Sequence, residues 1–274
     1  MTASHGPLGQ PTAYPDRYDA GLLFAIPRAA NRASLGIENA LPFVGADIWN
    51  AYELSWLDAR GKPAIAMASV TVPADSPRIV ESKSFKLYLN SFNQTRWTGP
   101  ERVLEALRTD LATATGAAVG IELILPERFG QRRAADLAGI CLDGQDIDIE
   151  TYAPDAGLLR CAATDATVSE TLMSRLLKSN CPVTGQPDWA CVQIRYTGRP
   201  LDRAALLRYL VSFRGHAEFH EHCVERLYVD IMAACRPREL SVYARYTRRG
   251  GLDINPWRAT PGSPAPDNIP TPRQ

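Results

Sequence analysis

The sequence lacks the glycine-rich loops with which many proteins bind nucleotides. Neither a G-x-G-x-x-G run after a strand nor a G-x-x-x-x-G-K-[ST] loop occurs in the 274 residues. This absence excludes the common dinucleotide-binding fold and the P-loop, and it leaves other modes of nucleotide binding open.

An excess of charge and long apolar runs are also missing. Thirty basic residues balance thirty acidic ones, so the net charge is zero. That balance argues against bulk electrostatic binding to nucleic acid or to an anionic membrane. No apolar run reaches the roughly 18–20 residues of a membrane helix, and the first 17 residues do not form a secretory signal. We therefore expect a cytoplasmic protein that binds neither nucleic acid directly nor a membrane.

Cysteine pairs at metal-binding or redox spacing are absent too. The six cysteines are spread over the second half of the chain with no Cys-x-x-Cys. We expect reduced thiols that are mostly buried. Lysine is scarce, with only four residues in the whole sequence.

Hydrophobic periodicity in the first half predicts strands and one clear helix. Alternation predicts a hairpin over 52–72, a further strand over 85–90 and another over 119–125. A capping box at Thr98 with a stop at Gly116 predicts the helix between them. The first forty or so residues are expected to form an irregular arm, and regular structure is expected to begin near Ile48.

The second half repeats this mixture of elements. An acidic stretch, 143–157, is the best linker candidate, and it divides the chain into domains 1–150 and 151–274. The proline-rich tail from Asn255 is expected to form neither a helix nor a central strand. Each half of the sequence therefore shows an α+β pattern of antiparallel strands and helices. Predicted elements of this half are a helical stretch at 170–177, strands at 192–196 and 240–246, and helices at 200–213 and 217–234.

Two polar segments stand out as candidates for chemistry. Glu81–Arg96 holds two of the four lysines among hydroxyls and amides, which fits either a polar strand edge or an anion site. Cys181 lies in a loop with prolines and a glycine, where we expect a thiol more accessible than the others. Asp188 follows seven residues later and is a candidate proton carrier.

Two further segments carry histidine or arginine clusters. The run from Arg214 to Cys223 holds three of the four histidines. It lacks the spacing of a zinc motif, so base recognition by a carboxylate and a histidine is the alternative to a metal site, and we expect no metal. The arginines and glycines of Arg245–Gly251 suit either a phosphate site or a solvated basic turn.

Together these segments resemble one family, the NADPH-dependent 7-cyano-7-deazaguanine reductases of the queuosine pathway, in its long two-module form. The likeness spans nearly the whole chain in order and ends near Arg258. The runs that carry it are Tyr18–Arg28, Asp47–Trp56, Glu81–Arg96, Ser179–Trp189, Phe219–Arg226 and Arg249–Arg258.

The resemblance implies an α+β fold of two tandem tunnelling-fold (T-fold) modules. Each module would be an antiparallel sheet with helices packed on one face, and subunits would pair around a shared tunnel as a homodimer. The implied reaction is the four-electron reduction of a nitrile on a free deazapurine base to an aminomethyl group with two NADPH, in tRNA queuosine biosynthesis.

The resemblance also assigns roles to particular residues. Cys181 would attack the nitrile carbon to form a thioimide, and Asp188 would deliver the proton to nitrogen. The positions that would hold the base are Val80, Glu81, Ser82, His220 and Glu221. The positions that would hold NADPH are Ser82, Lys83, Arg249 and Gly250.

Three other functions compete with this interpretation. Another T-fold purine or pterin enzyme of the cyclohydrolase type would share a base-anchoring glutamate but use no NADPH. A non-catalytic purine-binding module would need neither Cys181 nor Asp188, so the Cys–Asp loop disfavours it. A thiol amidase or nitrilase is disfavoured because no catalytic lysine is evident near the cysteine.

Overall fold

A computed structural model describes residues 14–38 and 40–274 of the chain. The chain packs as two compact units whose segments alternate along the sequence. Unit 1 contains residues 14–31, 46–133 and 248–254, and unit 2 contains the remaining described residues. Among the described residues, no helix is long and apolar enough to cross a membrane.

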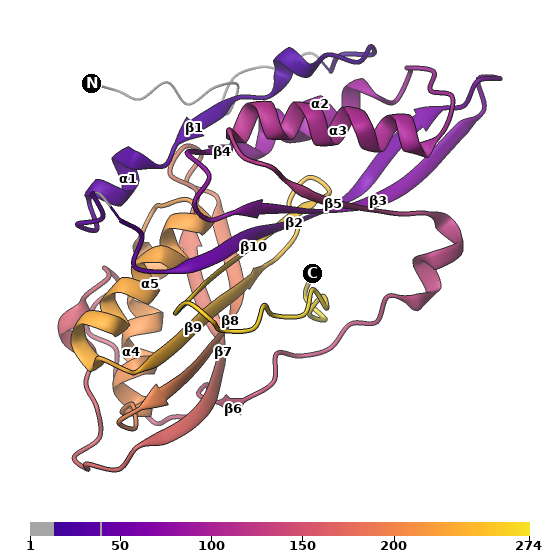
Figure 1. The fold of residues 1–274 in the computed structure, drawn as a ribbon. Coiled ribbons are helices and arrows are strands. Elements are labelled where there is room, and N and C mark those ends of the chain that lie inside the picture. The colour runs from indigo at the N-terminus through magenta and orange to yellow at the C-terminus, as the bar shows by residue number, and fades with distance from the viewer. Residues whose placement is uncertain (1–13, 39) are drawn as a thin grey trace. The chain divides into compact units, whose positions relative to one another are not determined.

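Unit 1 is built on an antiparallel sheet in the order β5-β3-β2, followed by the first residues of β10. A small second sheet pairs β1 with β4. Helices α2 and α3 lie on one face of the main sheet (Figure 1). The bounds are β1 Ala25–Pro27, α1 Ala29–Ala33, β2 Val44–Leu57, β3 Pro63–Pro73, β4 Arg78–Val80, α2 Ser82–Ser91, α3 Pro100–Thr115 and β5 Gly120–Ile124, with short 3-10 turns η1 Ala20–Leu22 and η2 Pro126–Gln131.

The predicted hairpin, helix and last strand of this unit are confirmed as β2–β3, α3 and β5. In α3 the apolar stripe Val103, Leu107 and Leu111 is at most 1% exposed, as expected of one helical face packed on a sheet. The helix ends at Gly116, whose positive φ of 76° suits a left-handed cap. The predicted capping box is wrong, because Gly99 is the N-cap and makes no side-chain hydrogen bond.

The strand predicted over 85–90 is wrong, because these residues belong to α2. Glu81 starts the helix: its carboxylate oxygens accept from the amides of Lys83 and Ser84 at 2.7 and 3.0 Å. The buried side chains Phe85 and Tyr88 then follow helical spacing. Regular structure also begins before residue 48, with η1, β1 and α1.

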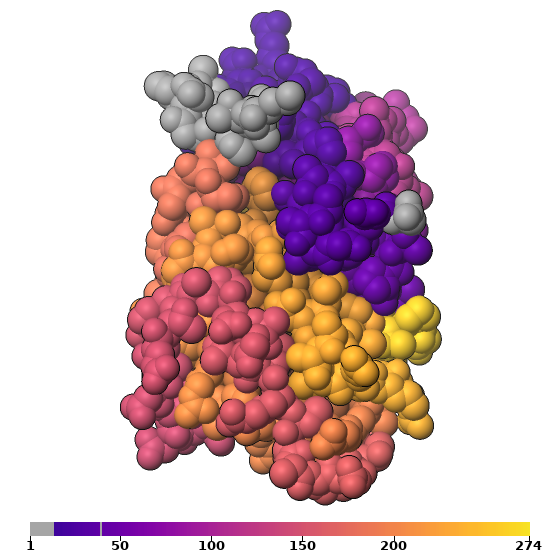
Figure 2. Space-filling model, turned by 90° about the vertical axis from the view of Figure 1, so that its left-hand side faces the viewer, coloured from indigo at the N-terminus to yellow at the C-terminus, as the bar shows by residue number. Residues whose placement is uncertain are grey.

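Unit 2 contains the strands in the order β10-β9-β8-β7-β6, of which only the β6–β7 pair is parallel. Helices α4 and α5 lie side by side on one face of the sheet (Figure 1). The chain around η3 lies on the surface of this unit beside α5 (Figure 2). The bounds are β6 Ile140–Cys141, η3 Ala156–Leu158, β7 Val168–Asn180, β8 Pro187–Gly198, α4 Arg203–Ser212, η4 Phe213–Gly215, α5 His220–Cys235, β9 Glu239–Tyr246 and β10 Leu252–Ala259.

Two predictions for this half are wrong. The helical stretch expected at 170–177 is part of β7, which pairs with β8 almost from end to end. The tail from Asn255 was expected to avoid a central strand, yet residues up to Ala259 belong to the fully buried strand β10. Its proline, Pro256, lies before the pairing with β9 at Trp257–Ala259, so it removes no bond from that ladder.

The same short capped sequence occurs once in each unit. Asp-Ala-Gly-Leu-Leu stands at 19–23 and again at 155–159. In both places the aspartate caps a 3-10 turn by accepting from the amide two residues later, at 2.8 Å for Asp19 and 2.8 Å for Asp155. The two units thus share both this short sequence and its conformation.

The two helix pairs also share a tyrosine–aspartate hydrogen bond. In unit 1 the hydroxyl of Tyr88 on α2 donates to Asp110 on α3 at 2.5 Å. In unit 2 the hydroxyl of Tyr209 on α4 donates to Asp230 on α5 at 2.6 Å. Each bond joins the first helix of a pair to the second at the same place.

The hairpin turns of the two units are closed by similar backbone bonds, although the β7–β8 turn is one residue longer. In the β2–β3 turn the amide of Gly61 donates to the carbonyl of Asp58 at 3.0 Å, and in the β7–β8 turn the amide of Gly185 donates to the carbonyl of Cys181 at 2.9 Å. Both glycines have positive φ, 88° and 69°. Asp58 and Cys181 each follow the last paired residue of the first strand, so they hold corresponding places in turns of different length.

A buried ion cluster crosses the interior of unit 2. The carboxylate of Glu225 on α5 accepts from Arg32 at 2.7 Å and from Arg258 of β10 at 2.9 Å. Side-chain exposure is 9% or less for all three residues. The guanidinium groups also lie over the ring of Phe43, 5.7 and 5.4 Å from its centre.

Replacing Glu225 with glutamine should destabilise the protein strongly. Two buried guanidinium groups would lose their shared counter-charge, and removing one partner of a buried ion pair costs about 3–5 kcal/mol. Urea unfolding measures the free energy. The control is Glu105→Gln, which breaks an exposed pair with Arg102 and should cost less than about 1 kcal/mol. Equal losses in the two variants would contradict the expectation.

Candidate functional site

The predicted nucleophile lies in a closed turn between β7 and β8. The amide of Cys181 donates to the carbonyl of Gln186 at 2.8 Å, and the Gly185 bond closes the turn from the other side. Because the turn folds back on itself, Cys181 is only 4% exposed. The expectation that it is more accessible than the other thiols is therefore wrong. Cys141 is exposed and Cys161 is half-buried, and the remaining cysteines are buried.

The predicted proton carrier stands on the strand that leaves this turn. Asp188 is the second residue of β8, is paired with Ser179 of β7, and is 3% exposed. Its Oδ2 lies 3.2 Å from Nε2 of His220, the first residue of α5. The structure thus brings a buried carboxylate against a buried imidazole at the end of the hairpin that carries Cys181.

The start of α5 is tied to the same hairpin through the backbone. The amide of Asn180, next to Cys181, donates to the carbonyl of His216 at 2.7 Å, and the amide of Glu218 donates to the carbonyl of Asn180 at 3.0 Å. These bonds fix where α5 begins. They place His220 and Glu221, which are 8% and 4% exposed, beside the Cys–Asp turn.

An ion network lies at the beginning of α5. His216 and His222 contact the carboxylate of Glu218, and Arg226 adds a pair at 3.2 Å. Burial raises the pKa of Glu218, but the hydrogen bonds from these three residues outweigh it and hold that pKa well below its usual value. Two histidines of this run, His216 and His222, therefore bind the carboxylate of Glu218. Among the residues that the structure describes, no group of three or more His, Cys, Asp or Glu side chains is arranged to hold a metal ion.

One neighbour of the site had no sequence signal. The ring of His220 stacks on the ring of Tyr246, the last residue of β9, with centres 3.8 Å apart and planes 7° apart. In the sequence Tyr246 is only the end of an alternating run. The contact joins residues 26 positions apart, which periodicity within one segment does not reveal.

The other predicted residues belong to unit 1. Val80 ends β4, Glu81 caps α2, and Ser82 and Lys83 form its first turn. Glu81 is 1% exposed. Burial raises its pKa and outweighs the hydrogen bonds from the two backbone amides, which lower it. Each carboxylate oxygen keeps a second lone pair, so Glu81 can still accept hydrogen bonds from a ligand.

Arg249 and Gly250 lie in the turn between β9 and β10. The amide of Arg249 donates to the carbonyl of Leu252 at 2.9 Å, and Gly250 and Gly251 both have positive φ, as a type I′ turn requires. A Cβ added to Gly250 would lie 3.1 Å from the ammonium nitrogen of Lys86 on α2. The structure therefore brings the turn beside the helix that starts with Ser82 and Lys83.

This part of unit 1 fits a phosphorylated ligand through side chains. Lys83, Lys86 and Arg249 supply positive charge, which Glu53 offsets in part at 3.5 Å from Lys86. The first amides of α2 are already bound by Glu81, so phosphates would be held by lysine and arginine rather than by the helix end. A cavity of about 90 Å³ adjoins the turn.

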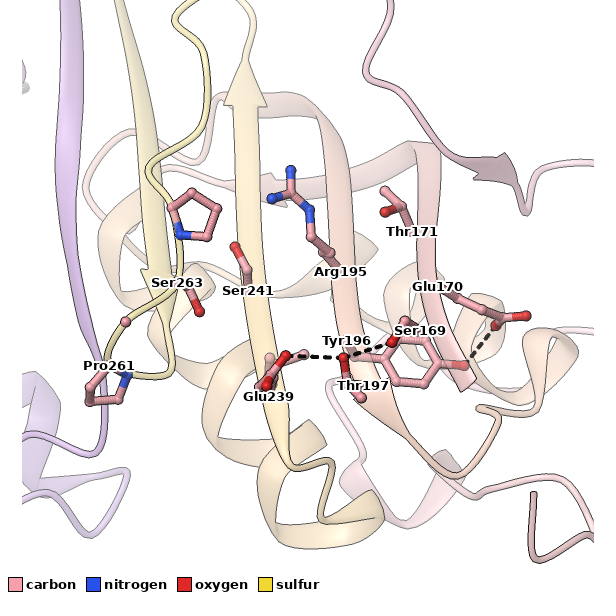
Figure 3. A pocket seen from close by; sticks show the side chains of 13 residues that line it. Ser169, Glu170, Thr171, Arg195, Tyr196, Thr197, Glu239, Ser241, Pro261 and Ser263 are labelled. Atoms are coloured by element: carbon pink, nitrogen blue, oxygen red, sulfur yellow. Dashed lines mark hydrogen bonds between the residues drawn. The ribbon is translucent and has the colours of Figure 1, made fainter. Parts of the chain in front are cut away.

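A larger cavity of about 400 Å³ holds none of the predicted site residues. It lies on the sheet of unit 2 between β7, β8, β9 and the loop at Pro261–Pro264 (Figure 3). Arg195 and Ser241 face it from adjacent strands, while Glu239 accepts from Thr197 at 3.1 Å. This cavity and the Cys–Asp turn are thus different places.

A mixed α+β chain with a buried thiol near a carboxylate–imidazole pair has the parts of an enzyme that works by nucleophilic and acid–base chemistry. Residues 14–123 match the family described as "Nitrile reductase, 7-cyano-7-deazaguanine-reductase N-term", and residues 187–264 match the family described as "QueF-like protein". The chain is 66% identical to the NADPH-dependent 7-cyano-7-deazaguanine reductase of Bordetella pertussis and 57% identical to that of Burkholderia ambifaria, each over all of both chains.

The chain belongs to the NADPH-dependent 7-cyano-7-deazaguanine reductase family, so the resemblance predicted from the sequence is confirmed. A solved archaeosine synthase QueF-Like in the apo form is a far weaker match. It is 21% identical over 37% of this chain and 99% of its own, with a TM-score of 0.32.

Replacing Glu218 with glutamine should remove part of the acid sensitivity of the fold. A carboxyl whose pKa is lowered by folding adds stability above its unfolded pKa, and that stability is lost as the pH falls towards its folded value. The difference in unfolding free energy between the wild type and Glu218→Gln should shrink below about pH 5, by up to about 1.4 kcal/mol per pH unit.

Urea unfolding at several pH values from 7 to 4 measures this difference. Glu105→Gln, at an exposed surface pair, is the control and should follow the wild type at every pH. A constant gap between the wild type and Glu218→Gln across this range would contradict the assignment.

Proposed function

We propose that this chain reduces the nitrile of 7-cyano-7-deazaguanine to an aminomethyl group with two molecules of NADPH, in the route to queuosine. Family membership over the full chain supports the reaction. The observation that carries the residue roles is the turn that holds Cys181 beside the buried Asp188–His220 pair.

Cys181 would act as the nucleophile and Asp188 as the proton carrier. A nitrile accepts hydride poorly, but addition of the thiol sulfur to its carbon gives a thioimide with a polarised C=N bond. Asp188 would take the thiol proton and place it on the nitrile nitrogen, so that no charge is left on the adduct. A carboxylate shielded from water suits this transfer because few water molecules compete for its proton.

NADPH, when bound, supplies the hydride for each of the two reductions. After the first, the sulfur would leave the carbon as the thiolate of Cys181, so the remaining C=N bond is free for the second. The two reductions together also take up two protons: one would pass through Asp188 to nitrogen, and one would restore the Cys181 thiol. The net change is one nitrile to one primary amine.

The base would be held by glutamates that accept from its N–H edge. Glu221 and His220 at the start of α5 are proposed for this role, together with Val80, Glu81 and Ser82 at the start of α2. A buried carboxylate that accepts two hydrogen bonds recognises a guanine-like edge specifically, because an analogue without those donors leaves it unpaired.

The proposal also includes the organisation of the chain as two tandem T-fold modules, 1–150 and 151–274, in a cytoplasmic homodimer. The repeated capped turn, tyrosine–aspartate bond and hairpin closure support a duplication. The compact units do not follow the chain in two halves, since 134–150 packs in unit 2 and 248–254 packs in unit 1. The module boundary at 150 and the homodimer stay predictions.

Replacing Cys181 with alanine should abolish both the reaction and the covalent adduct. Without sulfur no thioimide forms, and the nitrile remains a poor hydride acceptor. NADPH oxidation with 7-cyano-7-deazaguanine measures turnover, and intact mass without NADPH measures the adduct. Cys141→Ser, at an exposed thiol, is the matched control and should keep both. Turnover by Cys181→Ala would overturn the mechanism.

Replacing Arg249 with glutamine should weaken NADPH binding with little effect on the adduct. The loss of one phosphate-binding guanidinium is expected to raise the KM for NADPH about tenfold. Cys181 adduct formation without NADPH should stay at the wild-type rate. Arg60→Gln, at an exposed arginine of the β2–β3 turn, is the control. An unchanged KM for NADPH in Arg249→Gln would refute the assignment.

A further inference from the structure

The imidazole of His220 is held between two side chains from different strands. On one side its Nε2 lies 3.2 Å from Asp188 of β8. On the other its flat face lies 3.8 Å from the ring of Tyr246 of β9, with the planes almost parallel. A stacked ring at this distance prevents the imidazole from turning about its Cβ–Cγ bond without a clash.

Tyr246 itself is fixed from several directions. It is fully buried, and its backbone pairs with Ala190 of β8. Its carbonyl accepts from the side chain of Gln274 at 2.8 Å, and the amide of the next residue donates to the carbonyl of Trp189 at 2.8 Å. These contacts fix the position of the Tyr246 ring.

The hydroxyl of Tyr246 makes a less well-defined contact than its ring. It is buried but makes no hydrogen bond of good geometry, and the same holds for the neighbouring hydroxyl of Ser179. Both lie close to the thiol of Cys223, which is also buried. The ring, rather than the hydroxyl, makes the well-defined contact with the site.

We infer that Tyr246 is a positioning residue: its ring, stacked on His220, holds that imidazole against Asp188 in the orientation that proton delivery needs. The inference rests on the proposed function, since it assigns Asp188 the proton. Tyr246 itself does not touch the reacting atoms. It acts through His220, by restricting the imidazole to the orientation that faces the carboxylate.

Titratable groups lie near the Asp188–His220 pair on each of the elements packed against it. The carboxylate of Asp188 acts electrostatically on three titratable groups around it: Lys178 of β7, Cys223 of α5 and Tyr246 of β9. Burial raises the pKa values of Cys223 and Tyr246 far above their usual range, so both remain neutral near neutral pH. A change in the pH profile on losing the Tyr246 ring would therefore report on the Asp188–His220 contact.

Two variants separate the ring from the hydroxyl. Tyr246→Phe keeps the stacked ring and should form the Cys181 adduct within about twofold of the wild-type rate, with the same pH profile. Tyr246→Leu removes the ring and should slow adduct formation about tenfold and shift its pH profile. The measurement is the rate of adduct formation by the full chain with 7-cyano-7-deazaguanine, without NADPH, from pH 5 to 9.

Tyr228→Leu is the matched control for the loss of a buried ring. Tyr228 packs edge-on against Phe43 and donates to the carbonyl of Pro42, so its loss should lower stability without shifting the pH profile. The inference fails if Tyr246→Leu, folded by circular dichroism, keeps the wild-type rate and profile. It also fails if Tyr246→Phe is as slow as Tyr246→Leu, because the hydroxyl would then be the important group.

A second readout holds even if Tyr246→Leu does not fold. The chain has only four histidines, so the imidazole protons of His220 can be assigned by NMR with a His220→Gln variant. In the wild type and in Tyr246→Phe they should be shifted upfield by the ring stacked on them, and an unshifted signal would overturn the inference. This arm needs no substrate. A wild type that stacks but forms no adduct would count against the proposed function alone.

Discussion

The register of the β7–β8 hairpin is the constraint on which the site depends. Pairing Ser179 with Asp188 decides that the carboxylate faces α5 and that Cys181 falls at the turn. Because side chains alternate along a strand, a slip of one residue would send Asp188 to the opposite face of the sheet. The closed turn and the backbone bonds from Asn180 to the start of α5 hold this register at the point where the proposed chemistry takes place.

Much of the architecture could be predicted from local sequence patterns. The β2–β3 hairpin, the stripe of α3 and its stop at Gly116 follow from alternation, helical spacing and glycine conformation. The alternation of Phe85, Leu87 and Leu89 predicts a strand where the structure has helix α2. The helix begins at the cap supplied by Glu81, a residue that the resemblance assigns to base binding.

Burial and cross-strand contacts were harder to foresee. A loop with prolines and a glycine usually exposes its cysteine, but this turn closes on itself and Cys181 is buried. The prolines of the tail from Asn255 predict no central strand, yet Pro256 lies in β10, where no bond to β9 is lost. The stack of Tyr246 on His220 requires β9 and α5 to meet, which no pattern within either segment encodes. The resemblance to the reductase family, by contrast, needed only the order of the motifs.

The equivalent turns of the two units have a consequence for how such a chain evolves. The place held by Cys181 in one hairpin is held by Asp58 in the other, where the carboxylate accepts from the amides of Arg60 and Lys62 at 2.8 and 2.9 Å and serves the turn alone. Under the proposed duplication, the two hairpins would divide two tasks: the Asp58 turn secures its own backbone, and the proposed nucleophile occupies the other turn. A substitution in one turn would then leave the task of the other unchanged.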